Sequence, residues 1–181
     1  MAAVNMWGFI LLALSCWNYV SGCTWMKTQK KASLSNFQIL SNSSISHLEL
    51  AVSTTTNYHR PAFPNKQYNH SKDHILFILR TLKNVMRVYD GKYDKTDCDQ
   101  PKLQIFLLDI HRQVSELEQC VSRWLNRRIL KKMEIHFKSL ISHLKNTDYS
   151  AKGWNDIAGV VLRHLRRLDL LAIKTKNDCS L

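Results

Sequence analysis

The sequence predicts an all-α protein on three observations. Only five glycines and three prolines occur in 181 residues, so few positions interrupt a helix. Apolar residues recur mainly at spacings of three and four rather than two, which is the period of a helix with one buried side. Four long stretches with this pattern follow one another between residues 71 and 171. We therefore expect four amphipathic helices that share one core.

Each of these four helices has a recognisable boundary. Asp90-Gly91 ends the first. Pro101 suits the first turn of the second, because its missing N–H would be unpaired there anyway. Asn146-Thr147-Asp148 interrupts the third, and the hydroxyl of Ser150 is a suitable N-cap for the fourth. The expected ranges are about 71–89, 101–121, 128–144 and 150–171.

A fifth helix is expected near the start of the chain, from about Met26 to Leu40. Some 30 residues, Asn42 to His70, then separate it from the next helix. Loops of this length are uncommon unless they cross over or carry function. Two consecutive helices that run parallel require such a crossover, as in an up-up-down-down bundle. We therefore expect that topology, with the long crossover loop after the first helix.

Residues 1–22 have the features of a cleavable secretory signal. An uncharged start precedes the apolar run Met6 to Leu14, and Val20-Ser21-Gly22 suits signal peptidase. The run has about ten residues, half of the roughly 20 that a bilayer-spanning helix needs. We expect a signal peptide at 1–22 and one secreted domain at 23–181, without membrane insertion; an anchored form stays as an alternative.

Cleavage after Gly22 removes Cys16 and leaves four cysteines in the mature chain. These are Cys23, Cys98, Cys120 and Cys179, and in an oxidising compartment they allow three pairings among which the sequence alone does not choose. Asn42 and Asn69 begin N-glycosylation sequons, and use of these sites would place both at the surface.

The net charge of +12 favours acidic partners and polyanions. A cluster of four basic residues, Arg127, Arg128, Lys131 and Lys132, is suited to the sulfate groups of heparan sulfate. A basic face that is only solvated remains the alternative. Nucleic acid is disfavoured because aromatic residues are nearly absent from the cluster.

No motif for catalysis, a cofactor or a metal is found. The chain lacks a glycine-rich phosphate loop, a GxSxG motif and an HExxH motif. His136 and His143 are seven residues apart and could share a helix face, but no third ligand stands at the short spacing of a zinc site. We therefore expect a protein that binds partners and is not an enzyme.

The chain resembles the type I interferons, and the fish members most closely. The resemblance covers nearly all of the mature chain and preserves the order and spacing of its segments. The segments that carry it are Cys23-Thr24-Trp25-Met26, Phe63-Pro64-Asn65-Lys66-Gln67-Tyr68, Phe106-Leu107, His111-Arg112-Gln113, Leu117-Glu118-Gln119-Cys120-Val121, Tyr149-Ser150 and Trp154 with the helix that follows it.

This resemblance implies a secreted helical cytokine of five helices, of which four form the main bundle, and we expect it to be a monomer. It further implies that the protein brings together two chains of a class II cytokine receptor of the interferon α/β type and triggers JAK-STAT antiviral signalling. Two alternatives stay open. One is another helical cytokine, of the type III interferon or interleukin-10-like kind. The other is a secreted basic helical protein that acts directly on membranes or microbes.

The resemblance also assigns roles to individual residues. The family's N-terminal disulfide maps onto Cys23 and Cys120, whereas pairing of Cys98 with Cys179 stays open. An arginine that the family often uses toward the second receptor chain falls on Glu134, and members often have arginine where Tyr58 and Ala158 stand. The positions that correspond to contacts with the high-affinity receptor chain are Tyr58, Ala158, Gly159, Leu162, Arg163 and Arg166, and Arg60 is placed to add positive charge.

Overall fold

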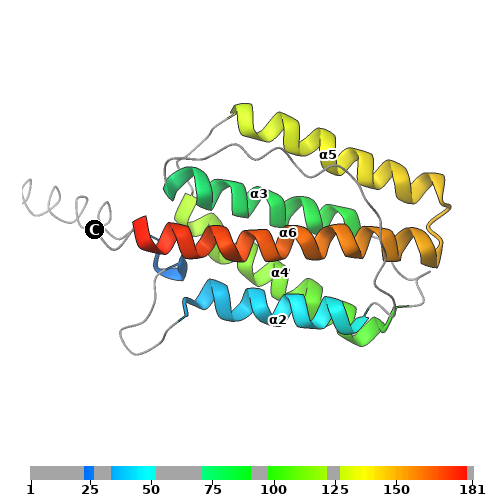
Figure 1. The fold of residues 1–181 in the computed structure, drawn as a ribbon, viewed down its shortest axis with the longest axis horizontal. Coiled ribbons are helices and arrows are strands. Elements are labelled where there is room, and N and C mark those ends of the chain that lie inside the picture. The colour runs from blue at the N-terminus through cyan, green and yellow to red at the C-terminus, as the bar shows by residue number, and fades with distance from the viewer. Residues whose placement is uncertain (1–22, 27–33, 52–70, 91–97, 122–126, 179–181) are drawn as a thin grey trace, which may run out of the picture.

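The computed structural model describes residues 23–26, 34–51, 71–90, 98–121 and 127–178. All regular elements in these ranges are helices (Figure 1). They are the 3-10 helix η1 (Thr24–Met26) and the α-helices α2 (Asn36–Ala51), α3 (Ser71–Tyr89), α4 (Gln100–Val121), α5 (Arg127–Asn146) and α6 (Ala151–Asp178). Helices α3, α4 and α5 lie where the sequence predicts them, to within two residues at each end. Helix α6 begins as predicted and continues seven residues beyond Leu171.

The four long helices α2, α3, α4 and α6 form an up-up-down-down bundle (Figure 1). Helices α2 and α3 run in one direction, and α4 and α6 run in the other. Each of α4 and α6 packs against both α2 and α3. Helix α5 lies outside this bundle, where it contacts α3 and α6. The predicted fold class is therefore confirmed, with α5 as the fifth helix.

Aromatic side chains close the core at the end of the bundle where α6 begins. The Tyr89 ring stacks on Trp154 with centroids 5.4 Å apart and meets Phe106 edge to face at 5.6 Å. Trp154 and Phe106 are fully buried. The start of α6 is also capped as predicted, because the Gly153 N–H donates to Ser150 Oγ at 3.2 Å. This cap holds Trp154 in position against Tyr89.

Helix α2 corrects the prediction for the N-terminal part of the chain. The expected helix from Met26 to Leu40 is wrong: α2 begins at Asn36 and continues to Ala51. Its start is a capping box, in which the Gln38 N–H donates to Ser35 Oγ at 3.3 Å and the Ser35 N–H donates to Gln38 Oε1 at 3.1 Å. The crossover therefore starts after Ala51 rather than at Asn42, and residues 52–70 are outside the described ranges.

The turn between α5 and α6 is a Schellman motif without glycine. The Tyr149 N–H donates to the Leu144 carbonyl at 2.8 Å, and the Asp148 N–H donates to the Lys145 carbonyl at 3.1 Å. Asp148 and Tyr149 have φ values of 48° and 53°, in the left-handed region. The turn reverses the chain, so that α6 runs back along α5.

Candidate functional site

A disulfide joins Cys23 to Cys120, the pairing that the resemblance implies. The two residues are 97 positions apart in the chain, and their Cα atoms are 5.0 Å apart. The bond attaches the segment that contains η1 to the last turn of α4. The Arg112 guanidinium of α4 lies 5.7 Å from the ring centroid of Trp25, which adds a cation–π contact at the same junction.

The pairing of Cys98 with Cys179 stays a prediction, because Cys179 is outside the described residues. Cys98 itself is half-buried and packs against the hydrophobic core.

The receptor positions expected in α6 fall into two groups. Arg163 and Arg166 are exposed, and Gly159 and Leu162 are half-buried beside them on the same side of the helix. Ala158 differs, because it is only 2% exposed and belongs to the core. It has no side-chain surface to offer to a partner, so it is not part of this face. Tyr58 and Arg60 are outside the described residues.

The face extends from α6 onto α2 through an ion pair. The Arg166 guanidinium bonds the Glu49 carboxylate on α2, and both side chains remain largely exposed. Glu49 was not a candidate from the sequence, because the predicted N-terminal helix stopped before it. The Ser35-x-x-Gln38 capping box is the sequence signal for the true start of α2, and it does not indicate where the helix ends. We define the α6 face as Gly159, Leu162, Arg163 and Arg166 with the adjoining Glu49.

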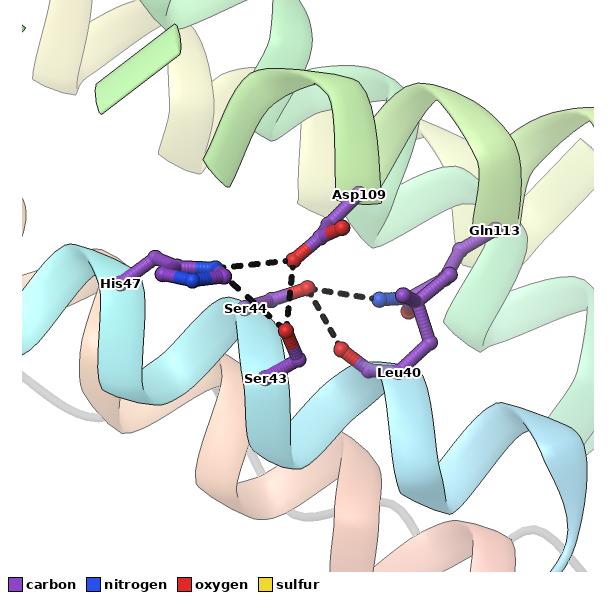
Figure 2. Close-up of polar contacts among 6 residues, drawn as sticks. All are labelled: Leu40, Ser43, Ser44, His47, Asp109 and Gln113. Atoms are coloured by element: carbon purple, nitrogen blue, oxygen red, sulfur yellow. Dashed lines mark hydrogen bonds and ion pairs between the residues drawn. The ribbon is translucent and has the colours of Figure 1, made fainter. Parts of the chain in front are cut away.

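A polar network joins α2 to α4 (Figure 2). The Ser43 hydroxyl donates to Asp109 Oδ2 at 3.0 Å, and His47 Nδ1 lies 3.1 Å from the same oxygen. One turn away, Gln113 Nε2 donates to Ser44 Oγ at 2.9 Å, and that hydroxyl donates to the Leu40 carbonyl at 2.8 Å. These bonds fix the register of two antiparallel helices whose contact includes several polar side chains.

The Ser43, His47 and Asp109 group does not have the geometry of a catalytic triad. In a triad the serine faces one ring nitrogen of histidine and the carboxylate faces the other. Here the Ser43 hydroxyl, at 3.4 Å, and the Asp109 carboxylate both approach Nδ1. A proton cannot be relayed through the ring in this arrangement, so the group serves helix packing.

Two histidine contacts join α5 to α6. The Nε2 atoms of His136 and His164 are 2.9 Å apart, and His143 Nε2 lies 3.2 Å from Asp156 Oδ2. Burial, together with the neighbouring His136 and the Arg167 and Arg163 guanidinium groups, lowers the pKa of His164 to about 3. His164 is therefore neutral at physiological pH, and its bond with His136 needs one ring to donate and the other to accept.

The two histidines considered as metal ligands do not lie close to each other. His136 and His143 contact different residues of α6, so they do not share a site. Within the described ranges, no group of three or more histidine, cysteine or carboxylate side chains is arranged to hold a metal ion. The same ranges contain no helix long and apolar enough to span a bilayer.

The remaining sequence candidates are at the surface or outside the described ranges. Lys131 and Lys132 of the predicted heparan sulfate cluster are exposed on α5, as is Glu134, and Asn42 of the first sequon is exposed on α2. The second sequon residue, Asn69, and the expected signal peptide at 1–22 are not described.

Three comparisons with known proteins agree with one another. The sequence profile described as the interferon alpha/beta domain matches residues 26–174. Interferon a3 of Oncorhynchus mykiss is 28% identical over 180 residues, which cover 95% of this chain and 98% of that protein. Among solved structures, zebrafish interferon 1 superposes with a TM-score of 0.70 at 26% identity, over 77% of this chain and 96% of that one.

Proposed function

Since the chain belongs to the interferon alpha/beta family, we propose that it is a secreted type I interferon-like cytokine that brings two receptor chains together and triggers JAK-STAT antiviral signalling. Members of this family are cytokines and not enzymes. The proposed action requires no covalent step. Binding two receptor chains with one small protein raises the local concentration of the kinases attached to them.

The observation that carries the proposal is the match of the family profile across the helical bundle, from η1 to α6. The chain is expected to act as a monomer that engages two chains of a class II cytokine receptor. The high-affinity chain is assigned to the α6 face, with Tyr58 and Arg60 of the crossover segment. The second chain is assigned to the outer faces of the middle helices.

The α6 face is suited to an acidic receptor surface. Arg163 and Arg166 point outward, and Leu162 beside them offers apolar area. Arginine can form two parallel hydrogen bonds with a carboxylate, which adds geometric specificity to the charge. Heparan sulfate is a further proposed extracellular partner, supported by the net charge of +12, and it would concentrate the protein at cell surfaces.

The test is charge reversal on the α6 face. We expect R163E/R166E to lose at least about tenfold in affinity for the high-affinity receptor ectodomain and in antiviral gene induction in host cells, because two favourable charges become repulsive. K152E/K174E is the matched control, since it changes the same charge at exposed positions near the ends of α6. An equal loss in both variants would refute the assignment of this face.

A second variant separates receptor contact from helix packing. E49R/R166E exchanges the two charges and leaves an ion pair between α2 and α6. We expect stability close to that of the wild type, since exposed pairs contribute about 0–1 kcal/mol. Receptor affinity should still fall, because the positive charge has moved to the other helix. Full affinity in the exchanged variant would mean that Arg166 acts only within the protein.

A further inference from the structure

The positive charge of this protein is concentrated on two neighbouring helices. Together α5 and α6 contain twelve Lys and Arg against four Asp and Glu, which is a net +8 of the chain's +12. Helices α2 and α4 have a net charge of −1 each. Figure 1 shows α5 at one edge of the molecule and α2 at the opposite edge. The bundle therefore has one strongly basic side, of which α5 is the outermost element.

The outer surface of α5 presents its lysines in a row. Lys131, Lys138 and Lys145 are seven residues apart, so they project from the same side of the helix at intervals of about 10.5 Å. All three are exposed, and within the described part of the chain none of them is in an ion pair. The only carboxylate of α5 is Glu134. We call Lys131, Lys138 and Lys145 the α5 lysine row.

A straight row of positive charges is suited to a linear polyanion. The residues around the row indicate which class of polyanion fits: nucleic acid, a lipid surface or a polysaccharide. Sequence-tolerant binding of nucleic acid uses aromatic side chains on which bases stack, whereas the exposed large apolar residues of the described ranges are all Leu or Ile. Insertion into a lipid surface needs an apolar helix face. The apolar side of α5 is already buried in the core, through Met133, Phe137, Leu140 and Leu144.

We propose that the α5 lysine row is a binding site for a linear sulfated polysaccharide of the heparan sulfate class. The inference rests on the proposed secretion of the chain, because such polysaccharides are extracellular. It differs from the cluster expected from the sequence, since the row follows the length of α5 rather than its first turn. Lys132 is a further exposed lysine of α5, and the net positive charge of the adjacent helix α6 adds long-range attraction.

The proposed site and the α6 face are on different sides of α6. His164 of α6 faces α5 through its contact with His136, whereas Arg166 faces α2 through its pair with Glu49. A polysaccharide along α5 therefore leaves the Arg166 side of α6 open. The polysaccharide can hold the protein at a cell surface while the high-affinity receptor chain binds.

The experiment measures binding of the full mature, disulfide-bonded protein to heparin as a function of salt. K131E/K138E should raise the Kd at 0.15 M NaCl by at least about tenfold and lower the slope of log Kd against log salt by about two, one for each lost contact. R87E/R112E is the control, because it makes the same charge change at exposed positions of α3 and α4. It should remain within about threefold of the wild type. Circular dichroism checks that both variants are folded.

Three results would overturn the proposal. They are an equal loss in both variants, which would assign binding to total charge; unchanged binding of K131E/K138E; and equal affinity of the wild type for phosphatidylserine vesicles or for desulfated heparin. The proposed cytokine function fails separately: wild-type protein that induces no antiviral genes in host cells would refute that function and leave the heparin result intact.

Discussion

At the scale of single residues, the histidines show how strongly the environment decides a side chain's role. His47 lies at the rim of the α2–α4 contact, where it bonds a carboxylate. His164 is 8% exposed and faces His136, Arg163 and Arg167, all of which oppose a positive charge on its ring. The sequence alone does not distinguish the two residues. Their environments differ because His47 lies between α2 and α4, whereas His164 lies between α5 and α6.

The lowered pKa of His164 predicts a stability that falls with acidification. Its pKa is about 6.5 in the unfolded chain and about 3 in the folded one, so between these values only the unfolded state takes up the proton. The free energy of unfolding should therefore drop by about 2 kcal/mol from pH 7 to pH 5 through this group. Urea unfolding at the two pH values measures it. H164F should remove this part of the drop, whereas H111Q, at an exposed position of α4, should keep it.

The turn after α5 offers a stabilising substitution. Asp148 has a φ of 48° at the position of a Schellman motif where glycine is usual. Asp148→Gly should raise the free energy of unfolding by about 1 kcal/mol and the Tm by about 2–4 °C, because glycine adopts this conformation without a Cβ clash. Asn146→Gly, at the last residue of α5, should lower stability instead. A lower Tm for the Asp148 variant would contradict the argument.

At the scale of helices, a helix is easier to predict from the sequence when the residues on its buried side are apolar. The buried sides of helices α3 to α6 consist mostly of apolar residues, so the helical period can be recognised in the sequence. Helix α2 buries the polar residues Gln38, Ser41 and Ser44, which masks its apolar stripe and shifted the prediction toward Met26. The last turns of α6 were missed for a similar reason, because the buried residues beyond Leu171 are the small Ala172 and the polar Thr175, which bonds His74 across the core.

The close contact between Gly153 and Thr147 at the start of α6 predicts that a side chain at position 153 lowers the stability of the protein. A Cβ on Gly153 would lie 2.2 Å from Thr147 Oγ1 and 3.0 Å from its Cβ, and that hydroxyl already donates to the carbonyls of His143 and Leu144. Gly153→Ala should therefore destabilise the protein by about 1–3 kcal/mol, as overpacking does. Adding Thr147→Ala should recover part of the loss, as measured by a double-mutant cycle in urea. Full additivity of the two substitutions would exclude the clash as the cause.

At the scale of the whole molecule, the residues that form the core and the residues proposed to bind the receptor lie on different sides of the helices. The sequence placed four helices and the exposed part of the α6 face, because the position of Trp154 fixes the register of that helix. It did not reveal that Glu49 borders the face, because that depends on how α2 packs against α6. The burial of Ala158 does follow from the helix period, since Ala158 is four residues after the buried Trp154 and three before the buried Val161. Contacts between helices distant in the chain are set by three-dimensional packing, which the period of one helix does not encode.

The Cys23–Cys120 disulfide stabilises this arrangement as a whole. Closing a loop with 97 positions between its ends restricts the unfolded chain, and the chain-entropy model gives about 4–5 kcal/mol. That is a large fraction of the roughly 5–15 kcal/mol that stabilises a typical protein.

We expect C23S/C120S to retain a helical circular dichroism spectrum at low temperature, because the core does not depend on the bond, but to melt about 10–20 °C lower. Dithiothreitol should lower the Tm of the wild type to that of the variant and leave the variant unchanged. If dithiothreitol still lowers the Tm of the variant, another disulfide contributes to stability. If the variant has the Tm of the wild type, removing the disulfide gives the unfolded chain little additional conformational freedom.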